Sequence, residues 1–260
     1  MKVVLFCGGL GLRLRETSDQ VPKPMVPIGP RPIIWHVMKY YAHYGHKDFI
    51  LCLGYKGETI KEYFIHYSEW ISNDFTLTGG KNAELASRDI DDWKITFVDT
   101  GLETLIGQRL RAVQPYLEGE EVFLANYSDN LTDFHLPNLT ERFLAEDKVA
   151  GFLCVRPSQS FHVVDASPNG DVTDIRDAAS SDIWLNGGYF ILRKKIFEYM
   201  RDGEELVVEP FQRLVRENKL MAYKYDGFWA CMDTFKEKQR LDDMSAKGGA
   251  VWQVWKGKSR

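Results

Sequence analysis

The sequence predicts an α/β protein built on a mixed, mostly parallel, doubly wound sheet with a strand-rich insertion. Residues 2–7 and 48–53 are short, continuous apolar runs, which is typical of parallel strands buried on both faces. A glycine-containing turn follows each run, and a stretch with helical spacing comes next. The order of strand, loop and helix therefore repeats, as it does in doubly wound sheets.

The remaining elements follow from spacing and turn residues. Residues 32–45 are expected to form a helix, with Pro32 in its first turn and Gly45 just past its end. Residues 74–93 interrupt the alternation, and Gly79-Gly80 predicts a hairpin or excursion there rather than a crossover. The other expected helices lie at 58–67, 104–117, 209–218 and 234–244, and the other strands at 94–99, 121–125, 149–155 and 220–225.

We expect one domain over residues 1–260, because no linker or repeat divides the chain. Within it, about 1–150 and 220–245 form one part, and the strand-rich segment 151–219 forms a second. Turns are expected at 168–170 and at Gly187-Gly188. Residues 246–260 form a tail whose apolar segment 251–255 packs either on a neighbouring copy or on its own subunit.

Composition excludes several classes of protein. The formal net charge of −4 argues against a general nucleic-acid binder, which needs a basic excess. No apolar stretch is long enough for a membrane span, so we expect a cytoplasmic protein without a membrane partner. Four cysteines lie far apart, and buried free thiols are the expected interpretation.

The loop after the first strand carries the clearest chemical signal. Its glycines, Gly8, Gly9 and Gly11, allow backbone amides to approach a ligand. Arg13 adds a forked cation suited to phosphate oxygens, and prolines on both sides of Lys23 restrict where its ammonium reaches. The alternative is an ordinary turn with a surface lysine, because isolated glycine motifs are weak signals.

Several segments together extend this pattern along nearly the whole chain. They are the loop at 8–13, Pro-Lys-Pro-Met-Val-Pro-Ile-Gly at 22–29, Gly-Tyr-Lys-Gly at 54–57, Asp-Thr-Gly at 99–101, Asn-Gly-Gly at 186–188 and Met-Asp-Thr at 232–234. In these segments the chain resembles the sugar-1-phosphate nucleotidyltransferases, and within them the glucose-1-phosphate cytidylyltransferases. The resemblance implies a Rossmann-like core with an added sugar-binding part, and relatives that commonly form homo-oligomers.

The resemblance also implies the reaction. A sugar-1-phosphate oxygen attacks the α-phosphorus of CTP, releasing pyrophosphate, and the protein aligns and neutralises the two anions. Arg13 and Lys23 match the catalytic cations of the family, and Gly8, Gly9, Gly11 and Arg109 match its nucleotide-binding positions. Asp129 and Asp233 match the two ligands of a Mg²⁺ ion, which prefers hard oxygen ligands.

Each of these matched residues also fits an ordinary structural role. Asp129 fits a turn aspartate, Asp233 a helix N-cap and Arg109 a solvated helix face. Cys231, two residues before Asp233, is interpreted as a packing residue, because a thiolate suits Mg²⁺ poorly.

The acceptor side departs from the family pattern. The family lysine that holds the sugar phosphate has no counterpart at 175–178, where the sequence is Ile-Arg-Asp-Ala. Arg176 and His162 are the nearest cations that could replace it, together with Asn186 and Gly187 as acceptor contacts. His162 fits a solvated loop histidine equally well. Smaller departures are Leu12 for threonine, Ser128-Asp129-Asn130 for Gly-Asp-Gly, Gly107-Gln108 for Gly-Gly, and 159–162 for Gly-Arg-Phe-Gly.

These observations support three hypotheses. The first is a cytidylyltransferase that uses CTP, Mg²⁺ and a small phosphorylated acceptor, either a sugar 1-phosphate or another phosphomonoester. The second is an enzyme of the same fold that uses dTTP or GTP. The third is a non-catalytic homologue that binds nucleotide, although keeping Arg13, Lys23 and both aspartates argues against it.

Overall fold

The computed structural model describes residues 1–9, 21–157 and 161–256. The strands are β1 (Val3–Phe6), β2 (Pro27–Ile28), β3 (Arg31–Pro32), β4 (Asp48–Leu53), β5 (Phe75–Thr78), β6 (Asn82–Leu85), β7 (Lys94–Asp99), β8 (Val122–Asn126), β9 (Asn130–Thr132), β10 (Ala150–Val155), β11 (His162–Ala166), β12 (Val172–Asp177), β13 (Leu185–Arg193), β14 (Leu220–Tyr225) and β15 (Trp229–Cys231). The α-helices are α2 (Ile33–His43), α3 (Gly57–Ile65), α4 (Glu69–Ser72), α5 (Ile106–Ala112), α6 (Leu136–Ala145), α7 (Glu209–Arg216) and α8 (Phe235–Ala246). Short 3-10 turns are η2 (Lys23–Met25), η3 (Gln114–Leu117), η4 (Ala178–Ser180), η5 (Lys194–Tyr199) and η6 (Val254–Lys256).

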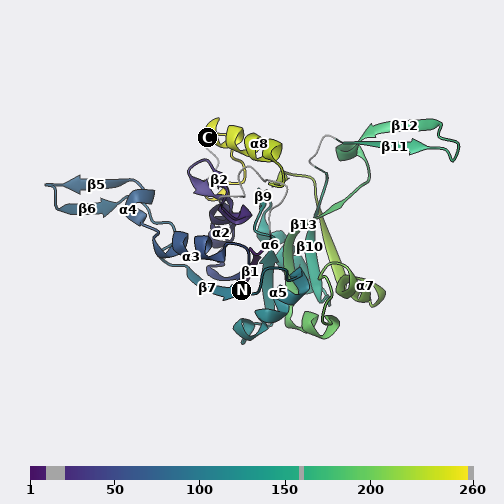
Figure 1. Ribbon diagram of the computed structural model, residues 1–260, viewed down its shortest axis with the longest axis horizontal. Coiled ribbons are helices and arrows are strands. Elements are labelled where there is room, and N and C mark those ends of the chain that lie inside the picture. Colours follow the sequence, from purple (N-terminus) through teal and green to yellow (C-terminus); the bar gives the residue numbers. More distant parts are fainter. Residues whose placement is uncertain (10–20, 158–160, 257–260) are drawn as a thin grey trace.

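A seven-stranded sheet forms the centre of the molecule (Figure 1), in the order β14-β10-β13-β8-β1-β4-β7. Strands β8, β1, β4 and β7 pair in parallel, as do β10 and β14. Strand β13 runs antiparallel to both of its neighbours. The predicted mixed, mostly parallel sheet is therefore confirmed.

Two apolar layers sandwich this sheet, because successive side chains of a strand point to opposite faces. In β1, Val3 and Leu5 belong to one core and Val4 and Phe6 to the other. Helices α2, α3 and α6 contribute buried residues to the first core, and α5 and α7 contribute to the second. This arrangement explains why β1 and residues 49–53 of β4 are apolar.

The sequence located most elements but not all of them. The helix expected at 104–117 is divided into α5 and η3, with Pro115 in the first turn of η3. The turn expected at Gly187-Gly188 is wrong, because both glycines lie within β13. There the register with β10 shifts, and Gly188 has a φ of +72°, so the glycines form an irregularity in a strand. Helix α6 was not expected.

The tail folds onto its own subunit. Trp252 is fully buried, and its indole Nε1 donates a hydrogen bond of 3.4 Å to Nδ1 of His36 on α2. Trp252 also stacks on Phe228. In the part of the chain that is described, no helix has the length and apolarity needed to cross a membrane.

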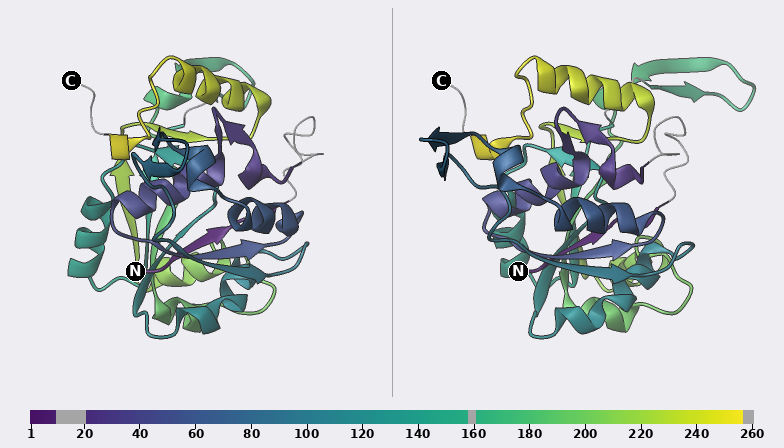
Figure 2. Two further views of the ribbon diagram at one scale, coloured as in Figure 1. Left: turned by 90° about the vertical axis from the view of Figure 1, so that its left-hand side faces the viewer. Right: turned by 60° about the vertical axis from the view of Figure 1, so that its left-hand side comes forward.

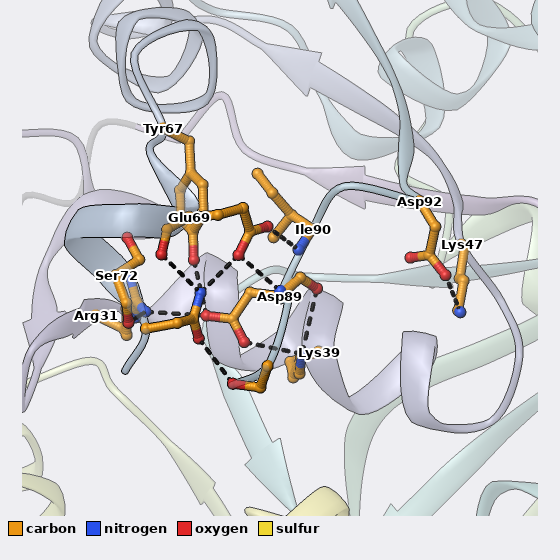
Figure 3. Close-up of polar contacts among 11 residues, drawn as sticks. Arg31, Lys39, Lys47, Tyr67, Glu69, Ser72, Asp89, Ile90 and Asp92 are labelled. Carbon is orange, nitrogen blue, oxygen red and sulfur yellow. Dashed lines mark hydrogen bonds and ion pairs between the residues drawn. The ribbon is translucent and has the colours of Figure 1, made fainter. Parts of the chain in front are cut away.

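Two hairpins stand away from the body at opposite ends (Figures 1 and 2): β5–β6 and β11–β12. A polar network ties the base of the first hairpin to the core (Figure 3). The Asp89 carboxylate accepts hydrogen bonds from Arg31 (2.9 Å), Lys39 (3.1 Å) and the Tyr67 hydroxyl (2.8 Å). Glu69 accepts from the backbone amides of Asp89 and Ile90. The expected excursion at 74–93 is therefore held at a defined position.

Candidate functional site

A cavity of about 700 Å³ opens at the carboxyl ends of three parallel strands. Gly8 and Gly9 follow β1, residues 102–106 follow β7, and residues 127–130 follow β8. Ligands of open α/β sheets bind at this edge. The cavity is also lined by Lys23, Asn186, Trp229 and Asp233.

A strained turn directs Asp129 into this cavity. Ser128 has a φ of 66°, a conformation that costs a non-glycine residue roughly 1 kcal/mol. Two hydrogen bonds hold the turn: the Ser128 hydroxyl donates to the Phe6 carbonyl at 2.8 Å, and its amide donates to Oδ1 of Asn126 at 3.2 Å. The hydroxyl of Ser128 thus helps to hold its own strained backbone in place.

Asp233 reaches the same place from a distant part of the chain. Strand β15 pairs with β9, so that Cys231 lies opposite Asn130, and the Met232 amide donates to the Asp129 carbonyl at 3.0 Å. Thr234, rather than Asp233, caps α8, because its side chain accepts from the amide of Glu237. The N-cap alternative for Asp233 is therefore wrong.

Lys23 lies between the two carboxylates. Its ammonium forms an ion pair with both Asp129 and Asp233, and its side chain is 15% exposed. Pro22 and Pro24 flank it, and Pro24 is buried in the turn η2. Burial lowers the pKa of Lys23, but the negative charge of Asp129 raises it further, so the net pKa lies above its ordinary value. The amine stays charged and holds two acidic groups together.

The same carboxylates could hold a metal ion. One ligand atom from each of Asp129, Cys231 and Asp233 lies within 4.8 Å of the others. Burial raises the pKa of the Cys231 thiol well above its usual range. A protonated thiol is a poor ligand, so the effective donors are carboxylate oxygens, which suit a hard cation. The expected packing role of Cys231 agrees with this chemistry.

Arg109 is buried rather than solvated, with 3% of its surface exposed. Its guanidinium donates hydrogen bonds to the carbonyls of Gly8, Leu53, Gly101 and Leu102, and to the Thr100 hydroxyl. A Cβ at Gly8 would lie 2.0 Å from Nη1 of Arg109, so this glycine makes room for the arginine as well as for any ligand. Arg109 forms no ion pair within the described residues, and its positive charge therefore acts on the cavity. A direct nucleotide contact stays a prediction.

Asn186 lines the cavity, and Gly187 follows it in β13. Nδ2 of Asn186 donates to the Tyr127 hydroxyl at 3.2 Å, and the Gly187 carbonyl accepts from Nε1 of Trp229 at 2.9 Å. Nδ2 of Asn130 also donates to the Gly187 carbonyl, at 3.3 Å. Hydrogen bonds with Tyr127, Trp229 and Asn130 thus hold the irregular part of β13 in place.

Some expected site residues lie elsewhere. His162 and Arg176 are on the β11–β12 hairpin, and neither lines the cavity. Arg176 forms ion pairs with Asp165 and Asp174 of its own hairpin. Gly11 and Arg13 fall outside the described residues, as do Leu12, Gln159 and Ser160. Their roles stay predictions.

Tyr127 and Trp229 were not expected at the site. Tyr127 follows the buried strand β8 two residues before Asp129, so its place at the sheet edge was recoverable from the rule used for Asp129. Trp229 was not, because its position depends on the short ladder between β9 and β15.

Known proteins are similar to this chain in both sequence and fold. The family described as Nucleotidyl transferase matches residues 2–235. The chain is 37% identical over 257 residues to a probable glucose-1-phosphate cytidylyltransferase of Bacillus subtilis (strain 168), covering 98% of this chain and 100% of the relative. It is also 37% identical over 258 residues to the glucose-1-phosphate cytidylyltransferase of Salmonella typhimurium, with the same coverage.

Two solved structures show the same fold. A UDP-glucose pyrophosphorylase complexed with UDP-glucose superposes with a TM-score of 0.70 at 16% identity, covering 95% of this chain and 98% of the other. HddC from Yersinia pseudotuberculosis, complexed with GMP-PN, has a TM-score of 0.65 at 21% identity, covering 94% and 99%.

Proposed function

Because the chain belongs to the nucleotidyl transferase family, we propose that it transfers a cytidylyl group from CTP to a phosphorylated sugar. The products are a CDP-linked sugar and pyrophosphate. The observation that carries this proposal is the 37% identity, over essentially the whole of both chains, to glucose-1-phosphate cytidylyltransferases.

The cavity supports a metal-dependent reaction. Asp129 and Asp233 already share one cation, the Lys23 ammonium, and the thiol beside them is protonated. This donor set fits Mg²⁺, and we assign the two aspartates as its protein ligands. When bound, the ion supplies charge neutralisation at the triphosphate oxygens.

The protein's own groups position and neutralise the reactants. Lys23 stays protonated, and we assign it to the α-phosphate, where negative charge develops as the pyrophosphate leaves. Arg109 adds positive charge behind Gly8, and Arg13 is assigned to the triphosphate by resemblance. The acceptor's phosphate oxygen is the nucleophile, so no side chain needs to form a covalent intermediate.

The acceptor contacts are assigned to Asn186, the Gly187 backbone and Tyr127. Lys23 and Arg109 are the cations among the described residues that line the cavity, and both are held by protein oxygens. We propose that the acceptor belongs to a class of phosphomonoesters that includes glucose 1-phosphate. We also propose that the protein acts in the cytoplasm and as a homo-oligomer.

Pyrophosphate release tests the activity. Purified protein is incubated with CTP and Mg²⁺, alone and with a panel of sugar 1-phosphates and other phosphomonoesters. Release that requires one of these acceptors supports the proposal. Clear CTP binding with no release for any acceptor would instead favour a non-catalytic homologue.

A thermal-shift comparison of nucleoside triphosphates tests which base the donor nucleotide carries. CTP should raise the unfolding temperature more than dTTP, GTP or UTP at equal concentration, because a ligand that binds the folded state more tightly stabilises it more. Stabilisation by dTTP or GTP but not by CTP would assign a different donor to the same fold.

A further inference from the structure

The first residues of β13 pair with a neighbouring strand on one side. Leu185 and Asn186 lie opposite Val155 and Cys154 of β10, whereas β8 pairs with residues 190–193 of β13. The irregular glycines separate these two parts of the strand. Contacts outside the sheet ladder can therefore decide where the segment that carries Asn186 into the cavity lies.

Arg156, the residue that follows β10, makes such contacts. Its guanidinium donates a hydrogen bond to the Ser181 carbonyl, and its Nε lies 3.2 Å from the Asp226 carboxylate. Its Cζ lies 4.2 Å from the centroid of the Trp184 ring. Arginine suits this place because its planar guanidinium donates from its edge while its face stacks on an aromatic ring. A longer contact with the fully exposed Asp182, at 3.9 Å, adds little.

The chain between these two contacts is held at further points. The Lys224 ammonium, at the end of β14, lies over the same indole ring, 4.8 Å from its centroid. Trp184 is half-buried, and contacts between cations and aromatic rings strengthen as water is excluded. Ser181 is 3% exposed, and its hydroxyl donates to the Ala178 carbonyl at 2.6 Å. Residues 181–184 are thus fixed immediately before β13.

We propose that Arg156 is a positioning residue for the acceptor, because it holds residues 181–184 and thereby fixes Asn186 at the cavity wall. This inference rests on the proposed function, in which Asn186 contacts the acceptor. Arg156 is not among the described residues that line the cavity, so it acts through the segment that it anchors. It also makes none of its contacts with Lys23 or Asp129, which we assign to the nucleotide and the metal. Its loss should therefore weaken acceptor binding and spare CTP.

Steady-state kinetics with the acceptor that supports pyrophosphate release tests this separation. Arg156→Gln should raise the KM for the acceptor about tenfold, with kcat and the KM for CTP changed by less than about twofold. Arg156→Lys should lie between the parent and Arg156→Gln, because lysine keeps the charge but loses the forked and stacked geometry. Circular dichroism checks that each variant folds.

A double-mutant cycle tests the contact with Trp184. Trp184→Leu should raise the acceptor KM as Arg156→Gln does. The double variant should be little worse than either single variant, because both changes remove the same contact. Fully additive effects would overturn the inference that Arg156 acts through Trp184.

Arg142→Gln on α6 is the matched control. Arg142 also pairs with an acid, Glu146, and lies over an aromatic ring, that of Tyr223. Its variant should keep the acceptor KM of the parent protein. An unchanged acceptor KM in Arg156→Gln, or an equal weakening of acceptor and CTP, would overturn the positioning role and leave the proposed function standing.

Hydrogen exchange keeps the inference testable if the proposed function fails. A parent protein that releases no pyrophosphate with any acceptor would contradict the proposed function, but it would not decide the role of Arg156. Faster exchange at residues 184–188 in Arg156→Gln than in Arg142→Gln would then support the anchoring role. Equal exchange in these two variants would overturn it.

Discussion

At the scale of single residues, the site depends on one cation held between two acids. Lys23, Asp129 and Asp233 come from segments more than a hundred residues apart. The prolines beside Lys23, the strained turn at Ser128 and the ladder between β9 and β15 bring them together. Sequence motifs identified all three residues, whereas the contact between Lys23 and the acids required the fold.

Asp129→Asn and Asp233→Asn test the metal assignment. Each removes a charged ligand of nearly the same shape, and we expect turnover to fall by at least about a hundredfold while the protein stays folded. Initial rates at several Mg²⁺ concentrations, with unfolding temperatures, measure both effects. Asp182→Asn, at an exposed position, is the control. A near-parental rate in either site variant would contradict that ligand.

At the scale of elements, Arg109 joins three loops that meet at the cavity. Its position could not be predicted from spacing on α5, because the carbonyls that it binds come from the ends of β1, β4 and β7. Helical periodicity therefore identified the helix and misjudged the environment of this side chain. Helix α6 shows the opposite failure: its buried residues follow helical spacing, so the signal was present in the sequence.

Arg109→Lys keeps the charge but loses the forked donor geometry. We expect the free energy of unfolding to fall by about 2–4 kcal/mol, because several buried carbonyls lose a charged donor. Urea unfolding measures this change. Arg111→Lys, on the same helix and with a backbone contact to Met200, should cost less. Unchanged stability with weakened CTP binding would instead identify Arg109 as a direct nucleotide contact.

Asp89→Asn tests the network at the base of the β5–β6 hairpin (Figure 3). The change leaves Arg31 and Lys39 without their shared carboxylate, and breaking a largely buried ion pair is costly. Hydrogen exchange should become faster in β5 and β6 than in α2. Asp92→Asn removes an exposed pair with Lys47 and should change little. Equal exchange in both variants would contradict the anchoring role.

At the scale of the whole molecule, the tail and the core are joined through His36. Because Trp252 donates to Nδ1 of His36, Nε2 carries the proton and donates to the Ile28 carbonyl at 3.1 Å. Burial lowers the pKa of His36 to about 4, whereas an unfolded histidine titrates near 6.5. The unfolded chain therefore takes up this proton first as the pH falls.

The stability supplied by neutral His36 is fully present above about pH 6.5 and is lost progressively down to about pH 4. The loss amounts to about 3 kcal/mol. Urea unfolding midpoints between pH 7 and 4 should fall more steeply for the parent protein than for His36→Gln. His162→Gln, on the exposed hairpin, is the control. Parallel pH profiles for the parent and His36→Gln would contradict this role of His36.

The sheet was predictable because its strands are buried on both faces and so read as apolar runs. The position of the β11–β12 hairpin was not predictable. Patterns of apolar residues indicate which side chains are buried within one chain, whereas this hairpin leaves apolar side chains exposed. Arg176 and His162 were expected at the acceptor because they are the cations nearest in sequence to the missing family lysine. The side that we propose for the nucleotide was easier to predict, because Gly8, Gly9 and Asp129 follow strand ends closely and two prolines flank Lys23.

The proposed reaction joins CTP and a phosphorylated sugar at the cavity. Phosphorus NMR of the protein with CTP, Mg²⁺ and glucose 1-phosphate tests it most directly, because it distinguishes the products. We predict equal formation of pyrophosphate and a new CDP-linked diphosphate, with neither formed by Asp129→Asn. Release of CMP without a sugar-linked diphosphate, or an unchanged spectrum with glucose 1-phosphate and every other acceptor of the panel, would contradict the proposed reaction.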